Sequence, residues 1–246
     1  MWIKICGLTT PDGVAAALDA GADAIGFVFA KSVRQVSSEV AVCLAAPARG
    51  RALCVAVTRH PSQQDIDEIV SVFKPDVLQT DSADLALLRL PTQLELLPVM
   101  RGAGGEAEAA GGVGRRELTP MRGAGDGKSA AGRGERGDQG RGWDGGDDGD
   151  ELVVLLPPRL LFEGLTSGAG VPCDWTAAGR VARRTELVLA GGLNPANVAA
   201  AIAAVQPFGV DVSTGVEVRP GVKSPAEIMN FVRAARESGA VCEVRV

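Results

Sequence analysis

The stretch LVLAGGLNPANV, residues 187–198, holds a strand, a turn and a helix start, and it decides the fold. Its apolar run, 187–190, predicts a buried strand, and the two glycines after it allow a tight turn. Asn194 and Pro195 predict a helix start, because asparagine is a favoured cap and proline is favoured at the first helical position. A second strand and turn follow at GVDVSTG, residues 209–215. Strands that alternate with helices indicate a parallel sheet.

The same unit recurs along the rest of the chain. We predict eight strands: Trp2–Cys6, Ala24–Phe29, Ala52–Val57, Val77–Gln79, Leu96–Met100, Arg159–Phe162, Leu187–Ala190 and Gly209–Val212. Their apolar residues run continuously, as expected for a sheet buried on both faces. The count of eight favours a closed α/β barrel, a (β/α)8 TIM barrel, over an open doubly wound sheet, and no G-x-G-x-x-G motif follows the first strand. We predict one barrel domain over residues 1–246.

Helical segments separate these strands. We expect them over Pro11–Ala20, from Ser37, over Ser62–Phe73, over Ala83–Arg89, after Asp174, from Asn194 and from Ser224. The last begins Ser-Pro-Ala-Glu, which is typical of a capping box because an acid follows the serine cap by three residues.

One region, Gly102–Asp150, lacks the alternation of strands and helices. Glycine dominates it, and its apolar residues have no period of 2 or 3.6. Such a composition cannot bury enough apolar area to offset the entropy of ordering, so we predict a disordered insert in place of the fifth helix. Its GGVG and GAGDGK pieces lack the preceding strand and the GK[ST] spacing of a phosphate loop.

Composition argues against several classes of protein. The formal charge of −5 argues against a nucleic-acid-binding surface, which normally carries an excess of Lys and Arg. A single histidine, His60, cannot build a histidine-based metal cluster, and five scattered cysteines form neither a disulfide framework nor a zinc motif. We expect no metal. No stretch has the pattern of a signal peptide or the roughly 20 apolar residues of a membrane helix, so we expect a cytoplasmic protein without a membrane partner.

Two turns predict a phosphate site. Functional residues of a barrel lie at the carboxyl ends of its strands, and a phosphate site is frequent after the seventh and eighth strands. Small residues there let backbone N–H groups approach an anion, which the helix starts that follow would also attract. The predicted phosphate-binding residues are Gly191, Gly192, Ser213, Thr214 and Gly215. From the residues alone, the alternative that these glycines only make tight turns stays open.

Four further strand-end residues are candidates for chemistry. Cys6 is either a buried core cysteine or a base or nucleophile, and Glu163 is either a solvated loop residue or a general acid at the barrel mouth. Arg34 is either a surface charge or a clamp for an anionic group. Asp211 lies inside an apolar strand, where a carboxylate without partners is costly to bury.

Five segments together resemble phosphoribosylanthranilate isomerase, an enzyme family of tryptophan biosynthesis. They occur in order and cover nearly everything outside the insert. The segments are KICGLT (4–9), GADAIGFVFAKSVRQVS (21–37), SGAGVPCDW (167–175), LVLAGGLNPANV (187–198) and GVDVSTGVEVRPGVK (209–223).

The resemblance implies an Amadori rearrangement of N-(5′-phosphoribosyl)anthranilate, a small sugar-phosphate substrate, without metal or cofactor. Opening the furanose needs a general acid at the ring oxygen, and shifting the double bond needs a general base for the C2′ proton. The resemblance implies Cys6 as the base and Glu163 as the acid. It implies phosphate on Gly192 and the Ser-Thr-Gly turn, and it implies that Arg34 and Asp211 hold the anthranilate side and the reacting sugar.

Several positions depart from the family pattern. The family most often has Asp at the position of Glu163, and its QLHG after the fourth strand is here Leu78-Gln79-Thr80-Asp81. Neither change removes the implied acid, base or phosphate turns.

Two other functions stay open. One is the histidine-pathway aminoaldose isomerase, a family that has a pair of aspartates on the first and fifth strands. Here those strands end in Cys6 and Arg101. The other is an inactive barrel that serves as a binding or scaffold module. The sequence leaves monomer and homodimer open.

Overall fold

A computed structural model of the chain describes residues 1–102, 156–164 and 173–243, the side chains only as far as residue 239. All described residues belong to one compact unit. The predicted insert, Gly102–Asp150, lies outside the described residues except for Gly102 itself, so its disorder and its place in the fifth connection stay predictions.

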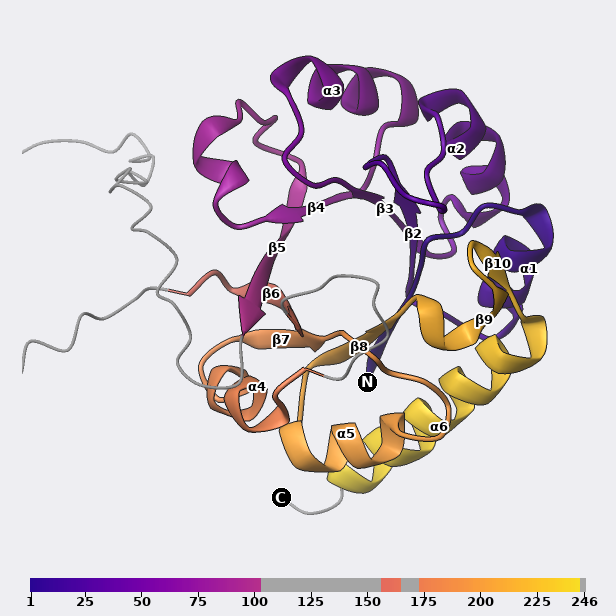
Figure 1. Ribbon diagram of the computed structural model, residues 1–246, viewed down its shortest axis with the longest axis vertical. Helices are drawn as coiled ribbons and strands as arrows, with labels where there is room; N and C mark the ends of the chain where they lie inside the picture. Colours follow the sequence, from indigo (N-terminus) through magenta and orange to yellow (C-terminus); the bar gives the residue numbers. More distant parts are fainter. Residues whose placement is uncertain (103–155, 165–172, 244–246) are drawn as a thin grey trace, which may run out of the picture. The chain divides into compact units, whose positions relative to one another are not determined.

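Eight parallel strands close into a barrel, and Figure 1 shows them as a ring with helices outside it. They are β1 (Trp2–Cys6), β2 (Ala24–Val28), β3 (Leu53–Val57), β4 (Val77–Asp81), β5 (Glu95–Gly102), β6 (Arg159–Gly164), β7 (Glu186–Leu189) and β8 (Gly209–Val212). Each strand pairs with its sequence neighbour, and β1 pairs with β8 to close the ring. The predicted (β/α)8 barrel is therefore confirmed.

Helices and short turns connect the strands. The α-helices are α1 (Pro11–Asp19), α2 (Ser38–Ala45), α3 (Gln63–Glu68), α4 (Trp175–Ala182), α5 (Val198–Val205) and α6 (Pro225–Glu243). Between them lie the 3-10 turns η1 (Ala46–Ala48), η3 (Asp84–Leu87) and η4 (Thr214–Val216), the π-helical segment η2 (Ile69–Phe73), and a hairpin of β9 (Glu217–Arg219) and β10 (Val222–Lys223). Two of the caps predicted from sequence are present: Ser224 accepts from the Glu227 N–H, and Asp174 caps α4.

Some local expectations were wrong. The helix expected over Ala83–Arg89 is only the turn η3. The strands expected to end at Gln79, Phe162 and Met100 each continue two residues further, because those residues still pair with a neighbouring strand. The helix expected from Asn194 begins at Val198. The reason is that the Asn194 side chain accepts from the N–H groups of the next residues and caps a tight turn rather than a helix.

Two apolar clusters hold the barrel. The inner cluster is built from small and medium side chains, as the narrow lumen of an eight-stranded barrel requires: Ala24, Val55, Val77, Leu97, Val99, Leu161, Val188 and Ala190. The outer cluster packs the helices on the strands and includes Phe27, Phe73 and Phe231, all fully buried. Burying each such large side chain contributes about 1.5–3 kcal/mol. Because this burial stabilises the barrel, the strands can also hold charged residues at one end of the lumen, where the site lies.

Candidate active site

One cavity of about 210 Å³ opens at the carboxyl ends of the strands. Its lining includes every residue that the sequence analysis singled out for catalysis or binding. These are Cys6, Arg34, Glu163, Gly191, Gly192, Asp211, Ser213, Thr214 and Gly215. The fold thus brings together residues that are up to 209 positions apart (215 − 6), although their individual roles stay predictions.

A buried ion pair joins β1 to β8. Lys4 and Asp211 are register partners, and the Lys4 Nζ donates to the Asp211 Oδ1 at 2.8 Å with the lysine fully buried. Burial alone would lower the pKa of Lys4, but the charge of Asp211 and hydrogen bonds with Asp211 and Cys6 outweigh it and raise the pKa. The buried carboxylate in GVDVS therefore has its partner. Sequence reasoning missed Lys4, although a lysine inside the apolar run WIKIC was a signal.

The Cys6 thiol lies beside this ion pair. Its residue is only 6% exposed. Burial raises the pKa of Cys6, the Lys4 ammonium opposes the rise, and the Asp211 carboxylate adds to it. A proton therefore binds Cys6 more firmly than it binds an ordinary thiol. The Lys4 ammonium stabilises the thiolate that forms when this proton leaves.

The two glycine-containing turns touch each other. Gly215 packs so closely on the preceding turn that a Cβ at this position would overlap the carbonyl oxygen of Leu193. Gly192 has φ +63°, in the left-handed region that favours glycine. The Asn197 side chain donates to the Gly192 carbonyl at 2.9 Å and accepts from the Asn194 N–H at 2.8 Å, which holds this turn in shape. Sequence reasoning missed Asn197.

Arg34 joins the turn after β8 to Glu217. Its Nε and Nη2 donate to the two carboxylate oxygens of Glu217 at 2.7 and 2.8 Å, and Nη2 also reaches the Thr214 hydroxyl at 3.2 Å. Lys223 donates to the same carboxylate at 2.9 Å and to the Ser213 carbonyl at 2.9 Å. Burial would raise the pKa of Glu217, but the hydrogen bonds from Arg34 and Lys223 lower it. The anion clamped in this structure is thus Glu217, which the sequence analysis did not name.

Glu163 pairs with a charge from the neighbouring strand. Arg101 on β5 is its register partner, and the Arg101 Nη1 donates to the Glu163 Oε1 at 2.5 Å. The other terminal nitrogen of Arg101 donates to Asp81 at the end of β4. All three side chains are mostly buried, and Arg101 and Glu163 line the cavity.

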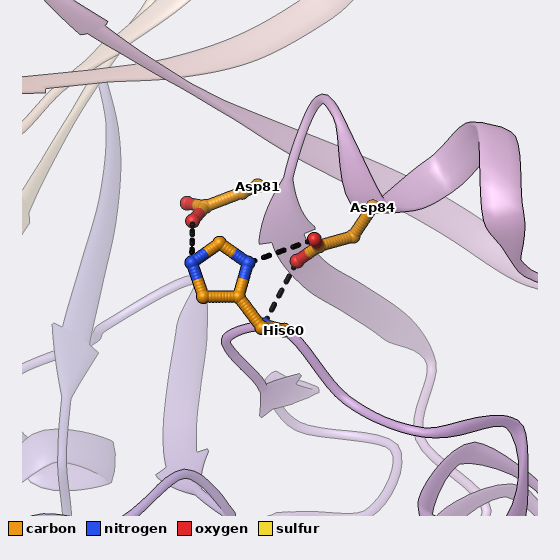
Figure 2. A group of neighbouring side chains, drawn as sticks. All are labelled: His60, Asp81 and Asp84. Carbon is orange, nitrogen blue, oxygen red and sulfur yellow. Dashed lines mark hydrogen bonds and ion pairs between the residues drawn. The ribbon is translucent and has the colours of Figure 1, made fainter.

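His60, which is largely exposed, contacts Asp81 on the solvent side of this group of charges. Figure 2 shows the His60 ring between two carboxylates: its Nδ1 lies 2.9 Å from the Asp84 Oδ1, and its Nε2 lies 3.6 Å from the Asp81 Oδ2. Their ligand atoms lie within 4.8 Å of one another, a spacing that a metal ion can bridge. The carboxylates already bind other groups, however, because Asp81 accepts from Arg101 and Asp84 accepts from the Thr80 hydroxyl and the His60 N–H. The arrangement is satisfied as a hydrogen-bonded network.

Gln79, from β4, also lines the cavity. It is 7% exposed, and its Oε1 is buried without a hydrogen-bond partner among the described residues. A buried acceptor without a donor costs about 1–3 kcal/mol, so a hydroxyl or N–H of a bound molecule would relieve this cost.

Titratable side chains and glycine turns at the carboxyl ends of barrel strands are the arrangement found in (β/α)8-barrel enzymes. A family model described as "N-(5′phosphoribosyl)anthranilate (PRA) isomerase" matches residues 3–97 and 156–234, which is more than half of the chain. The chain belongs to this family.

Curated relatives agree with this assignment. The N-(5′-phosphoribosyl)anthranilate isomerase of Rhizobium leguminosarum bv. trifolii is 36% identical and aligns over 97% of this chain and 95% of its own length. The isomerase of Brucella canis is 34% identical, with the same coverage of both chains.

Solved structures share the fold. TrpF from Jonesia denitrificans has a TM-score of 0.67 and 29% identity, covering 97% of this chain and 98% of its own. The phosphoribosylanthranilate isomerase of Thermotoga maritima, solved as monomers generated from a dimeric protein, has a TM-score of 0.68 and 24% identity, covering 96% and 99%. Among the described residues, no helix is long and apolar enough to cross a membrane.

Proposed function

We propose that this chain rearranges N-(5′-phosphoribosyl)anthranilate to 1-(2-carboxyphenylamino)-1-deoxyribulose 5-phosphate, with Glu163 as general acid and Cys6 as general base. Membership of the family makes the chain an aldose–ketose isomerase of tryptophan biosynthesis. The observation that supports the residue roles is the shared cavity, in which a thiol from β1 and a carboxyl from β6 line the same space as the two glycine turns.

Glu163 would act first. Its carboxyl would protonate the furanose ring oxygen while the bond from that oxygen to C1′ breaks and the anthranilate nitrogen lone pair forms the C1′=N bond. The carboxylate that results would lie against the Arg101 guanidinium, which stabilises negative charge there. A positioned acid of this kind contributes about 10²–10⁴-fold to the rate.

Cys6 would act second. Its thiolate would remove the C2′ proton, and the electrons of that bond would form the C1′=C2′ double bond while the C1′=N electrons return to nitrogen. The resulting enol-amine becomes the product ketone. The Lys4 ammonium would stabilise the thiolate before the transfer.

The phosphate would bind where the turns after β7 and β8 touch. Gly191, Gly192 and Gly215 leave the backbone open to an anion, and Ser213 and Thr214 add hydroxyl donors. Thr214 and Gly215 belong to the 3-10 turn η4, in the part of the barrel where phosphate sites are frequent.

Arg34 and Asp211 would act on the other part of the substrate. Asp211, held by Lys4, would face the reacting sugar, and Arg34 would hold the anthranilate side while it anchors Glu217. We further propose a cytoplasmic enzyme that is a monomer or a homodimer and binds no nucleic acid. Free thiols at Cys6, Cys43, Cys54 and Cys173 suit a reducing compartment.

The test is the loss of anthranilate-type fluorescence when the purified protein is added to freshly made N-(5′-phosphoribosyl)anthranilate. We expect turnover above the spontaneous rate. Cys6→Ser and Glu163→Gln should each lower kcat by about 10²-fold or more, because each removes one proton-transfer group. No turnover by the folded wild-type protein would refute the proposed function. Wild-type kcat in either variant would refute that residue's role and leave the activity itself standing.

A further inference from the structure

Arg101 is shared between two carboxylates that come from the strands on either side of it. Asp81 ends β4 and Glu163 lies near the end of β6, while Arg101 stands between them on β5. The two terminal nitrogens of the guanidinium bind different carboxylates: Nη1 donates to Glu163 and Nη2 donates to Asp81. The Arg101 side chain is 19% exposed and the two carboxylates less, so water screens these contacts only weakly.

This sharing has a consequence for a general acid. A carboxyl that pairs alone with an arginine is held ionised, and an opposite charge at this range lowers a carboxyl pKa by about 1–3 units. An acid must carry its proton before it reacts. A second carboxylate on the same guanidinium makes the group of three negative by one charge, which makes it easier for Glu163 to bind a proton than in a one-to-one pair.

We propose that Arg101 is the positioning residue for Glu163, and that Asp81 shares its guanidinium so that Glu163 can both hold and release a proton. The proposal rests on the acid role proposed above. Arg101 fixes the carboxyl in the cavity and stabilises the carboxylate after transfer. Asp81 keeps that stabilisation from becoming so strong that Glu163 never carries the proton.

Other titratable groups near this trio come from two segments, the one after β3 and the one before α4. His60 and Arg59, which follow β3, lie 3.6 and 4.0 Å from the Asp81 carboxylate. The Cys173 thiol, just before α4, lies close enough to Glu163 that the carboxylate contributes to raising the pKa of the thiol to about 11, after the larger effect of burial. Both His60 and Arg59 contact Asp81, so they bear on the charge that Asp81 shares with Arg101.

The two neighbours of Glu163 should therefore change its titration in opposite directions. Asp81→Asn leaves Arg101 to Glu163 alone, so the pKa of Glu163 falls. Arg101→Met removes the positive charge, so that pKa rises by about one unit or more. Arg101→Lys keeps the charge and should leave the pKa near the wild-type value while it partly restores kcat relative to Arg101→Met.

Two measurements test this. The first is the pH dependence of kcat/KM: because Glu163 must be protonated to act, the limb of the profile that reports its ionisation should move to lower pH in Asp81→Asn and to higher pH in Arg101→Met. A limb that moves by about one pH unit changes the rate about tenfold at a fixed pH on that limb. The second measurement needs no activity: ¹³C NMR titration of glutamate side-chain carboxyls, with Glu163→Gln to identify the Glu163 signal.

A matched control lies at the other end of the same barrel wall. Arg159 also bridges carboxylates from two neighbouring strands, Glu95 and Glu186, and it is not among the residues that line the cavity. Arg159→Met should move neither the limb nor the Glu163 signal. Changes in the same direction for Asp81→Asn and Arg101→Met, or an unchanged Glu163 titration in folded variants, would overturn the proposal. An inactive wild-type enzyme would refute the function alone, since the NMR titration would still decide the coupling.

Discussion

Lys4 and Asp211 form an ion pair at 2.8 Å across the seam where β1 and β8 close the barrel. The pair lies 207 residues apart in sequence and beside the Cys6 thiol. Because both charges act on the pKa of Cys6, this ion pair affects the ionisation of the proposed base as well as the closure of the barrel.

Lys4→Met should destabilise the protein more than its small change in volume suggests. It leaves the Asp211 carboxylate buried without its ammonium, and removing one partner of a buried pair costs about 3–5 kcal/mol. Chemical denaturation monitored by fluorescence measures this free energy of unfolding. The double variant Lys4→Met/Asp211→Leu should recover much of the loss, because no unpaired charge is left. A single variant as stable as the wild type would contradict the pair's structural role.

Gly215→Ala should raise KM strongly and weaken competition by inorganic phosphate. The added Cβ overlaps the Leu193 carbonyl oxygen, so the two turns must separate at the proposed phosphate site. Initial rates at several phosphate concentrations measure both effects. Gly179→Ala, on α4, is the matched control because its Cβ would make only ordinary contacts, the nearest at 3.8 Å. An unchanged KM in Gly215→Ala would remove this turn from the phosphate site.

Arg34→Ala should mainly raise KM, by about tenfold or more. The change releases Glu217 and removes the hydrogen bond to Thr214, so the second turn loses its support and the substrate loses a cation. A bidentate arginine–carboxylate contact is stronger and more directional than a single hydrogen bond. Steady-state kinetics separate KM from kcat, and an effect confined to kcat would contradict a binding role.

Stability should fall as the pH rises above about 9. Burial raises the pKa of Cys54 to about 11 and of Cys173 to about 11, both above the ordinary value of 9.0. Groups whose folded pKa is raised contribute stability that is complete below the unfolded pKa and is lost as the pH rises toward the folded value. The loss is therefore expected between pH 9 and 11, at up to about 1.4 kcal/mol per pH unit for each thiol.

Urea denaturation at pH 8, 9, 10 and 11 measures this loss. Cys54→Ala should lower the stability at pH 8 but reduce its slope with pH, since one thiol fewer remains to ionise on unfolding. The exposed Cys43 provides the matched control, because Cys43→Ala should leave the slope unchanged. If the free energy of unfolding of the wild type did not change between pH 9 and 11, the raised pKa values of Cys54 and Cys173 would be contradicted.

The eight strands could be predicted because each is buried on both faces and leaves a continuous apolar run, as in β3 and β7. The turn after β4 was mistaken for a helix because a short polar-apolar stretch carries too little periodicity to separate a 3-10 turn from a helix. The start of α5 was misplaced because an asparagine that caps a turn and one that caps a helix look the same in sequence.

The candidate site was predictable only in part. Cys6, Glu163 and the two turns follow from the rule that barrel chemistry lies at strand ends. Arg101, Glu217 and Lys223 gave no comparable signal, because charged residues at strand ends and in hairpins are usually solvated.

The sequence by itself determined the barrel, the strand-end position of the proposed acid and base, and the family, since apolar runs, turn glycines and motifs are local signals. Only the tertiary structure decided which charges meet. Lys4 faces Asp211, and Arg101 binds both Asp81 and Glu163, because barrel closure and strand register bring those side chains together. The strength of an ion pair depends on the distance between its charges. The ion pairs between strands therefore affect how firmly each proposed catalytic group holds its proton.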